Sequence, residues 1–321
     1  MKKDFVSLAS FTREDIDEVF LLSRWMKQDS PSWYRPLAGK TAALIFEKPS
    51  LRTHISFEVG ILQLGGQSIF LSDNNIGLSS REAVRDAAEV ISRYNELIVA
   101  RTFAHESVES LARYATVPVI NALTDLLHPC QVMADAFTLA EYGLLSSTSK
   151  IAFIGDGNNV ANSWLELAGK IPMHFVLACP EGYEPDAGIL RKAQEAGVSR
   201  IDVVRDPFEA AHDAHVLYTD VWTSMGQEEE AIKRRQVFER YQINSTLLST
   251  ASPDCVVMHC LPAHRGEEIT GEVLEGPQSI VLTEAENRLH VQKGIMAFLF
   301  GERYEAVEHS PLMAESPALK E

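Results

Sequence analysis

TAALIFEKPSLRTHISFEVG, residues 41–60, joins two kinds of pattern and decides the fold. Thr41–Phe46 is a short apolar run, which predicts a buried strand. Ile55, Val59 and Leu62 then recur at the spacing that puts side chains on one face of a helix. A strand followed closely by a helix is the first half of a βαβ unit, so this stretch predicts a parallel sheet.

Short apolar runs alternate with helical segments along the rest of the chain as well. This alternation is typical of α/β proteins, and it predicts two doubly wound parallel-sheet domains joined by interdomain helices. The remaining strands of the first sheet are expected at residues 97–100 and 117–121. Those of the second sheet are expected at residues 151–154, 174–178, 201–204, 215–218, 255–259 and 279–282.

The chain has 321 residues, more than one domain usually contains, so two domains with separate cores are expected. Residues 129–142 have Val132, Ala136 and Leu139 at helical spacing, and this helix is expected to bridge the domains. An amphipathic stretch at residues 291–300 can pack on either domain, and its pattern does not decide which.

Charge and hydropathy limit the classes of partner. Lys and Arg number 29 and Asp and Glu number 45, which gives a formal net charge of −16. An acidic surface repels nucleic acid unless a local basic stripe overrides it, and the sequence shows no such stripe. An anionic substrate therefore needs a concentrated positive pocket. No apolar run is long enough to span a bilayer, so no membrane partner is expected either.

The N-terminal segment and the cysteines bear on the compartment. The first residues lack an apolar core followed by a small-residue cleavage site, so they do not read as a secretory signal, and a cytoplasmic location is expected. The cysteines have neither a C-x-x-C pair nor regular spacing, which argues against a disulfide framework. They are Cys130, Cys179, Cys255 and Cys260.

Ser50, Leu51, Arg52 and Thr53 open the first helix shortly after a strand. Free backbone N–H groups at a helix N-terminus, two hydroxyls and a guanidinium together favour an anion. An ordinary Ser N-cap beside a surface charge is the alternative. Arg101 strengthens the anion-site hypothesis because it follows an expected strand, and parallel sheets bind ligands beyond the carboxyl ends of their strands.

HPCQ places His128 and Gln131 at the start of the helix at 129–142, where they face an expected cleft. A structural histidine is the more common alternative.

GDGNN, residues 155–159, follows a strand and resembles half of a dinucleotide fingerprint, so a nucleotide-binding dehydrogenase is a competing function. Val160 stands where that fingerprint needs a small residue, and a turn rich in amides suits a polar ligand better than a pyrophosphate.

DVWTSMGQEEE follows another expected strand and places Asp220, Ser224 and Met225 in a loop. Loops at strand ends commonly carry binding residues, although a charge in a loop is usually only solvated. EAENR places Arg288 near the start of the last helix, where a surface charge is the plain alternative.

HCLPAHRGEE puts Cys260 and Leu261 at the end of a strand that runs into a proline. His259, Cys260 and His264 match no common zinc spacing, so no metal site is expected. A cysteine in an apolar strand is more often inert than reactive.

Taken in order, these motifs are similar to those of one enzyme family. They are FEKPSLRTHISFEVG, HPCQ, GDGNN, DVWTSMGQEEE, HCLPAHRGEE and EAENR. Over nearly its whole length the chain resembles the carbamoyltransferases, and specifically the ornithine carbamoyltransferases. The resemblance implies transfer of a carbamoyl group from carbamoyl phosphate to L-ornithine, in arginine biosynthesis or, alternatively, in arginine catabolism. It also implies no cofactor and a homotrimer, and it leaves further assembly open.

The resemblance further implies that residues 1–133 bind carbamoyl phosphate, that residues 134–285 bind ornithine, and that a C-terminal helix within 286–321 packs back on the first domain. The implied phosphate ligands are Ser50, Leu51, Arg52, Thr53 and Arg101. The groups implied to approach the carbamoyl oxygen are Thr53, Arg101, His128 and Arg288, and those implied to accept from the carbamoyl NH2 are Gln131 and the backbone carbonyls of Cys260 and Leu261. The implied ornithine ligands are Asn159, Asp220, Ser224 and Met225, and the residues implied to act in catalysis are Arg101, His128, Asp220 and Cys260.

Some positions depart from the family pattern. The family motif usually reads Ser-Thr-Arg-Thr-Arg, and Leu51 and His54 replace its first Thr and second Arg here. Asn75 stands where some members carry a Gln that acts on the neighbouring subunit. The absence of lysine between Asp73 and Arg93 favours ornithine over aspartate as the substrate. The altered motif also leaves a non-catalytic binding protein of the same fold as an alternative.

Overall fold

The structure is a computed structural model of the chain. It describes residues 2–28, 32–72, 82–223 and 230–305. Contacts divide the chain into two compact units. Unit 1 contains the described residues of Met1–Val6, Ser10–Ala122 and Arg288–Glu321, and unit 2 contains those of Ser7–Ala9 and Leu123–Asn287. Each unit has its own sheet flanked by helices, which confirms the predicted class of two α/β domains.

The division by contacts does not fall at residue 133, where the sequence placed the border of the two substrate domains. Helix α6 (Pro129–Glu141) lies wholly in unit 2. Helix α13 (Val281–Leu299) belongs to unit 2 up to Asn287 and to unit 1 from Arg288. Compactness and substrate binding are different criteria, so the substrate domains 1–133 and 134–285 stay predictions. Residues 306–321 of the expected C-terminal segment lie outside the described residues.

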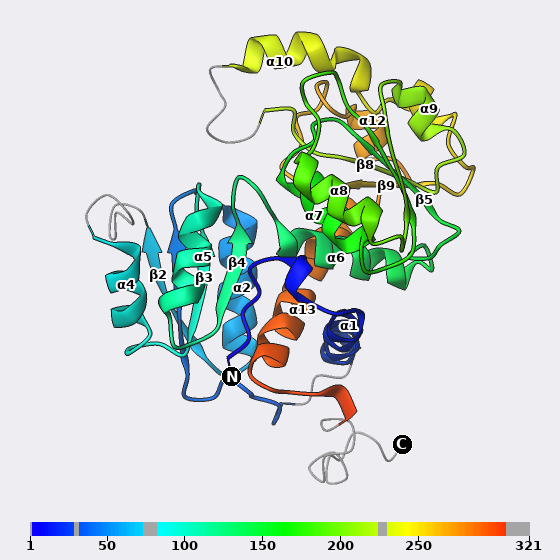
Figure 1. The fold of residues 1–321 in the computed structure, drawn as a ribbon. Coiled ribbons are helices and arrows are strands. Elements are labelled where there is room, and N and C mark those ends of the chain that lie inside the picture. Colours follow the sequence, from blue (N-terminus) through cyan, green and yellow to red (C-terminus); the bar gives the residue numbers. More distant parts are fainter. Residues whose placement is uncertain (1, 29–31, 73–81, 224–229, 306–321) are drawn as a thin grey trace, which may run out of the picture. The chain divides into compact units, whose positions relative to one another are not determined.

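Unit 1 is built on a four-stranded sheet with the order β2-β1-β3-β4 (Figure 1). Its strands are β1 (Thr41–Phe46), β2 (Gln67–Ser72), β3 (Leu97–Arg101) and β4 (Val119–Leu123). Its helices are α1 (Arg13–Gln28), α2 (Leu51–Gln63), α4 (Val84–Ile91) and α5 (His105–Tyr114), with the C-terminal part of α13. β1 pairs in parallel with β2 and with β3, and the register sets Phe46 beside Arg101. The carboxyl ends of β1 and β3 therefore lie at one edge of the sheet.

The central strands of unit 1 are continuous apolar runs because they are covered on both faces. On one face, Ile45 and Ile98 form a buried cluster with Val108 and Leu111 of α5. α2 supplies the buried Phe57 and packs on β2.

The apolar face predicted for α2 is not the buried one. Ile55 is 49% exposed and Leu62 is 69% exposed, whereas Phe57, Gly60 and Ile61 are buried. A Cβ at Gly60 would lie 3.2 Å from Met296 Cε of α13, so a small residue allows these helices to approach. Ile55, Val59 and Leu62 thus form a stripe that is exposed or half-buried in unit 1, because periodicity locates a stripe without telling what covers it.

Unit 2 is built on a five-stranded parallel sheet with the order β7-β6-β5-β8-β9 (Figure 1). Its strands are β5 (Lys150–Ile154), β6 (His174–Ala178), β7 (Arg200–Val204), β8 (Val216–Thr219) and β9 (Val256–His259). Besides α6 and the start of α13, its helices are α7 (Asn159–Ala168), α8 (Ala187–Glu195), α9 (Pro207–Ala211), α10 (Ala231–Phe238), α11 (Ser245–Leu248) and α12 (Gly271–Leu274), with the 3-10 turns η1 (Leu8–Ser10) and η3 (Glu239–Tyr241). The order reverses direction beside β5, as in doubly wound folds.

The two faces of this sheet carry different cores. Phe153 of β5 stacks on Tyr218 of β8, with ring centroids 5.1 Å apart, and Trp164 of α7 stacks on Phe175 of β6 at 6.0 Å. Ala152 alternates with Phe153 and belongs to the opposite cluster, which includes residues of α9. Within the segments that the structure describes, no helix is long and apolar enough to cross a membrane.

One predicted strand is absent from the described residues, and one observed strand was not predicted. Residues 279–282 were expected to form a strand, but only Ser279 bridges to Val257, and α13 begins at Val281. A four-residue apolar run does not distinguish a strand from the first turn of a helix. β2 was not predicted, because its residues are exposed or only half-buried and so lack a buried apolar run.

The sequence predicted an amphipathic stretch at residues 291–300, but α13 is not amphipathic. Its polar residues Gln292 and Lys293 are buried together with Val291 and Ile295. In unit 1 the helix lies against α1, and a Cβ at Gly294 would be 2.1 Å from Ser23 Oγ and 2.8 Å from the carbonyl oxygen of Val19. Glycine is therefore required at this crossing.

We predict that Gly294→Ala lowers the free energy of unfolding by ~1–3 kcal/mol, because the added methyl overlaps the backbone of α1. Thermal unfolding followed by circular dichroism measures the loss as a lower Tm. Gly271→Ala is the matched control, since its Cβ would meet nothing closer than Arg265 Cδ at 3.7 Å. The control should change stability by less than ~0.5 kcal/mol. Equal Tm values for the two variants would contradict the close crossing.

Candidate functional site

Asp220 collects hydrogen bonds at the carboxyl edge of the unit 2 sheet. It follows β8, and Cys260 follows the neighbouring strand β9. Asp220 Oδ1 accepts from Cys260 Sγ at 2.9 Å and from the Val221 N–H at 2.8 Å. Asp220 Oδ2 accepts from Asn158 Nδ2 at 2.7 Å. The structure thus brings together Asp220 and Cys260, which the sequence had placed in separate motifs.

The Cys260 side chain is a thiol that donates a hydrogen bond. Burial raises the pKa of Cys260 well above its usual range, and the neighbouring Asp220 carboxylate raises it further. A nucleophilic cysteine needs the opposite, a lowered pKa in a positive environment. The geometry therefore fits an orienting role for Cys260 and does not fit covalent catalysis.

The N-terminus of α7 adds two amides to this edge. Asn158 caps the helix, since its Oδ1 accepts from the N–H groups of Val160 and Ala161 while its Nδ2 holds Asp220. Asn159 donates from Nδ2 to the carbonyl oxygen of Thr124 at 2.7 Å. Asn159 was predicted from the sequence as a site residue and Asn158 was not, although an Asn directly before a helix is a recognisable N-cap.

The second glycine of GDGNN serves the packing of unit 2. A Cβ at Gly157 would lie 2.3 Å from the Pro185 nitrogen and 2.7 Å from the carbonyl oxygen of Tyr183. In a dinucleotide fingerprint the corresponding glycine allows a pyrophosphate to approach. Here the close neighbour is the chain itself, which removes the main argument for a nucleotide.

The segment after β9 is held by a buried histidine. The Leu261 N–H donates to His259 Nδ1 at 2.9 Å, and His259 Nε2 lies 3.0 Å from Glu268 Oε1. Nδ1 therefore acts as an acceptor and Nε2 carries the proton that Glu268 accepts. Leu261 has a φ of 55°, a left-handed conformation that non-glycine residues rarely adopt. The bond to His259 stabilises this conformation and fixes the carbonyls of Cys260 and Leu261.

His128 and Gln131 begin α6. The His128 N–H donates to Ser163 Oγ at 2.8 Å, and the His128 side chain is buried. Gln131 donates from Nε2 to Asp135 Oδ1 at 2.7 Å and to Glu284 Oε1 at 3.2 Å. Neither carboxyl group was predicted from the sequence, although Gln131 and Asp135 stand four residues apart on one helix face.

Unit 1 concentrates positive charge in an acidic chain. Ser50 caps α2, and its Oγ accepts from the Thr53 N–H at 3.3 Å. Arg288 Nη2 donates to Thr53 Oγ1 at 3.2 Å. Arg101 is buried at the end of β3, and Arg52 lies in the first turn of α2. A helix N-terminus with guanidinium groups in the same unit is suited to a phosphate.

Lys48 is a further buried cation of unit 1 that the sequence analysis did not name. Its Nζ lies 4.5 Å from the centre of the Phe103 ring, which follows β3. The face of an aromatic ring attracts such a cation, so Phe103 helps to hold the ammonium group in place. The position of Lys48 in the same motif as Ser50 was the feature of the sequence that could have indicated it.

The two departures from the family motif lie on the outer side of α2. Leu51 is 71% exposed. His54 stacks on Phe70 of β2 with ring centroids 4.0 Å apart, and its Nε2 lies 3.3 Å from Glu58 Oε2. His54 thus packs against the edge strand of unit 1.

Two groups of side chains in the described segments bring metal-ligand atoms within 4.8 Å of one another. One is Asp220, His259 and Cys260, and the other is His264, Glu267 and Glu268. In the first group the hydrogen bonds described above occupy both nitrogens of His259 and the thiol of Cys260. A cation there would have to replace those bonds.

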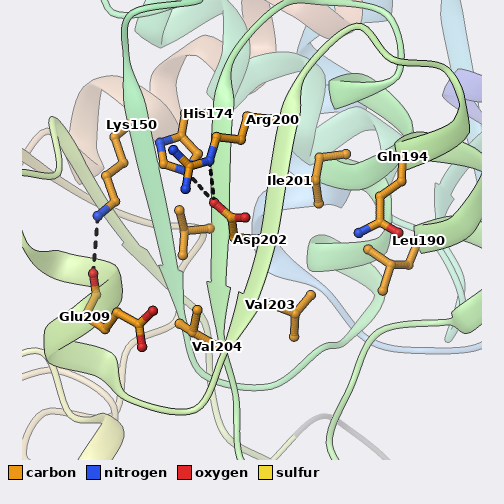
Figure 2. Close-up of a pocket in the computed structure, with 11 residues that line it drawn as sticks. Lys150, His174, Leu190, Gln194, Arg200, Ile201, Asp202, Val203, Val204 and Glu209 are labelled. Carbon is orange, nitrogen blue, oxygen red and sulfur yellow. Dashed lines mark hydrogen bonds and ion pairs between the residues drawn. The ribbon is translucent and has the colours of Figure 1, made fainter.

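Figure 2 shows a pocket of about 550 Å³ elsewhere in unit 2. Lys150, His174 and Arg200, the first residues of β5, β6 and β7, help to line it. Asp202 accepts from both His174 Nε2 and Arg200 Nε at 2.8 Å. The pocket runs along β7 from Arg200 to Val204, and neither Asp220 nor Cys260 lines it, so it is separate from the candidate site.

Ser224 and Met225, expected to bind ornithine, and Asn75 lie outside the described residues. Within unit 2 the structure clusters Asp220, Cys260 and Asn158, with Leu261 next in the chain. Within unit 1 it joins Thr53 to Ser50 and to Arg288.

Comparison with known proteins gives a consistent match. Residues 3–141 match the carbamoyl-P binding domain of aspartate/ornithine carbamoyltransferase, and residues 147–299 match its Asp/Orn binding domain. Ornithine carbamoyltransferase of Chlorobaculum tepidum is 54% identical over 303 residues, which cover 93% of this chain and 90% of that protein.

Two solved structures extend the comparison. Ornithine carbamoyltransferase from Pyrococcus furiosus has a TM-score of 0.88 and 45% identity, covering 94% of this chain and 97% of that one. Anabolic ornithine carbamoyltransferase from Campylobacter jejuni has a TM-score of 0.89 and 38% identity, covering 94% and 100%. Sequence and fold thus point to the same relatives.

We predict that Cys260 reacts slowly with iodoacetamide at pH 8, because its raised pKa keeps it a neutral thiol there. Asp220→Asn should accelerate the labelling several-fold, since the variant removes the neighbouring negative charge. Mass spectrometry of digested protein measures labelling at each cysteine, and Cys260→Ala gives the background from the other three. Labelling of Cys260 as fast as that of a cysteine in an unstructured peptide would contradict its raised pKa.

Proposed function

Because the chain belongs to the aspartate/ornithine carbamoyltransferase family, we infer that it transfers the carbamoyl group of carbamoyl phosphate to the δ-amine of L-ornithine, giving L-citrulline and phosphate. The observation that carries this function is 54% identity over 93% of the chain to a protein named ornithine carbamoyltransferase. The enzyme is a transferase. A dehydrogenase is disfavoured, because Gly157 packs against Pro185 and not against a ligand-sized space.

Carbamoyl phosphate is held, in this proposal, by the residues that the family motifs single out. The proposed phosphate ligands are Ser50, Leu51, Arg52, Thr53 and Arg101, and those of the carbamoyl oxygen are Thr53, Arg101, His128 and Arg288. The buried Arg101 and the Arg288–Thr53 hydrogen bond support these roles. Attack by an amine creates negative charge on the carbamoyl oxygen, and each well-placed donor lowers the barrier by ~3 kcal/mol.

The carbamoyl NH2 needs acceptors, which are the side chain of Gln131 and the backbone carbonyls of Cys260 and Leu261. Ornithine is held by Asn159, Asp220, Ser224 and Met225. A carboxylate at Asp220 suits a cationic amino group, and its bond to Cys260 keeps it oriented. The attacking amine must first lose a proton, since its ordinary pKa is ~10.4.

We also propose a homotrimer, able to assemble further, that acts in the cytoplasm in arginine biosynthesis rather than catabolism. Exposed apolar residues of α2 and β2 in unit 1, among them Leu62, Ile69 and Phe70, supply a surface for subunit contact. None of the four cysteines, all described, is in a disulfide, as suits a reducing compartment. The relative from Campylobacter jejuni is described as anabolic, which favours biosynthesis.

The reaction itself is tested by measuring citrulline colorimetrically from carbamoyl phosphate and ornithine. Arg52→Ala should lower kcat/KM for carbamoyl phosphate about 10- to 100-fold, because a charge-assisted hydrogen bond contributes ~1.5–3 kcal/mol. Arg113→Ala, an exposed arginine on α5 of the same unit, is the control and should leave turnover unchanged. Full activity in folded Arg52→Ala would refute the phosphate role.

Substrate choice gives a separate prediction: N-acetylornithine should react at least ~10³-fold more slowly than ornithine in kcat/KM. Acetylation removes the positive charge that Asp220 would bind, and a buried charge without its partner costs several kcal/mol. Each ~1.4 kcal/mol corresponds to a tenfold change in kcat/KM. Asp220→Asn should lose most of this preference. A variant that keeps the full preference would show that another group recognises the α-amine.

A further inference from the structure

Gln131 sits in an unusual environment for an uncharged side chain. It is buried, and so are the two carboxyl groups that its amide nitrogen contacts, those of Asp135 and Glu284. Asp135 is one turn further along α6, and Glu284 lies in the first turn of α13. All three residues belong to unit 2.

This arrangement fixes which way the amide points. The amide nitrogen has two N–H donors, and it donates to Asp135 Oδ1 at 2.7 Å and to Glu284 Oε1 at 3.2 Å. A flipped amide would instead press its carbonyl oxygen against Asp135 Oδ1, which is an acceptor in this arrangement. The Gln131 oxygen is therefore turned away from both acids.

Both carboxyl groups are themselves held in place. Tyr218 donates from its hydroxyl to Asp135 Oδ2 at 2.9 Å, and the His259 N–H donates to Glu284 Oε2 at 2.9 Å. Burial raises the pKa of Glu284 well above its usual range, and the adjacent Asp135, which hydrogen bonds to it, raises it further. The protonated form of Glu284 is therefore favoured, which lets it lie beside Asp135 in the interior.

Such a cluster is a poor way to stabilise a fold. Buried carboxyl groups lose hydration, and apolar residues of similar size would stabilise the core at least as well. Buried acids with shifted pKa values gather at functional sites more often than elsewhere. Glu284 also binds the backbone just before Cys260, so one carboxyl group contacts two parts of the proposed carbamoyl site.

We propose that Asp135 and Glu284 are positioning residues that hold the Gln131 amide so that its carbonyl oxygen, and not its NH2, meets the substrate. This role rests on the proposed function, in which Gln131 accepts a hydrogen bond from the carbamoyl NH2. The pair thereby selects an acyl phosphate that carries an amino group, because an acyl group without N–H has nothing to donate to that oxygen.

Glu284→Gln tests the proposal with a side chain of the same shape. The His259 N–H requires an acceptor at the Oε2 position, so the new amide places its oxygen there and its NH2 toward Gln131. Two NH2 groups then face each other at that position, so Gln131 loses one of its two acceptors and Asp135 alone holds its amide. kcat/KM for carbamoyl phosphate should fall at least tenfold, while KM for ornithine stays within twofold.

Inorganic phosphate is the discriminating probe, because it lacks the carbamoyl NH2. Its inhibition constant should stay within twofold in Glu284→Gln. Asp135→Asn is a second variant with the same expected result, since the Tyr218 hydroxyl keeps the new oxygen at Oδ2 and the NH2 faces Gln131. An equal loss of affinity for phosphate and for carbamoyl phosphate in both variants would indicate general damage and would overturn the positioning role.

A double-mutant cycle separates action through Gln131 from a structural effect. In a Gln131→Ala background, Glu284→Gln should change kcat/KM for carbamoyl phosphate less than twofold. Additive losses would overturn the proposal. Asp202→Asn, a carboxyl-to-amide change at the edge strand β7, is the matched control and should keep full activity. A wild-type chain that forms no citrulline would refute the function itself, whereas an active wild type with an unchanged Glu284→Gln would refute only the positioning role.

Discussion

The carboxylate of Asp220 accepts hydrogen bonds from groups that follow β8, follow β9 and precede α7, and the ligand edge of unit 2 depends on it. Parallel strands end at a common edge, which brings Asp220 and Cys260 together although 40 residues separate them. Burial, together with this carboxylate, raises the pKa of Cys260 and keeps it a thiol. The acid therefore orients the neighbouring sulfur and contributes to its protonation.

Charge is distributed unevenly in this acidic chain. The formal net charge is −16, yet unit 1 buries Lys48, Arg101 and Arg288. A cation loses hydration when it is buried, so such positions indicate a nearby anion or a strong acceptor. In unit 2 the buried ionisable side chains are mainly acids, including Asp156 and Asp220. The buried cations of unit 1 support the proposal that an anionic phosphate binds there.

The exposed apolar face of α2 connects the departures from the family motif with assembly. Leu51, Ile55 and Leu62 lie on this helix, and His54 stacks on Phe70 of the adjacent edge strand. An exposed edge strand with apolar side chains tends to recruit another chain. The replacements at positions 51 and 54 therefore alter this outer surface, whereas Arg52 and Thr53 keep the residue types of the motif.

The sequence by itself determined the fold class, most of the buried strands and the chemical types at the candidate site, because apolar runs and ordered motifs are local properties of the chain. It did not determine β2 or the start of α13, where the local signal was weak or ambiguous. Only the tertiary structure decided that α2 buries Phe57 instead of Ile55, and that Asn158 serves Asp220. It also decided that Glu284 contacts Gln131. Each of these depends on a hydrogen bond or packing contact between residues far apart in the chain, and no local pattern encodes such a partner.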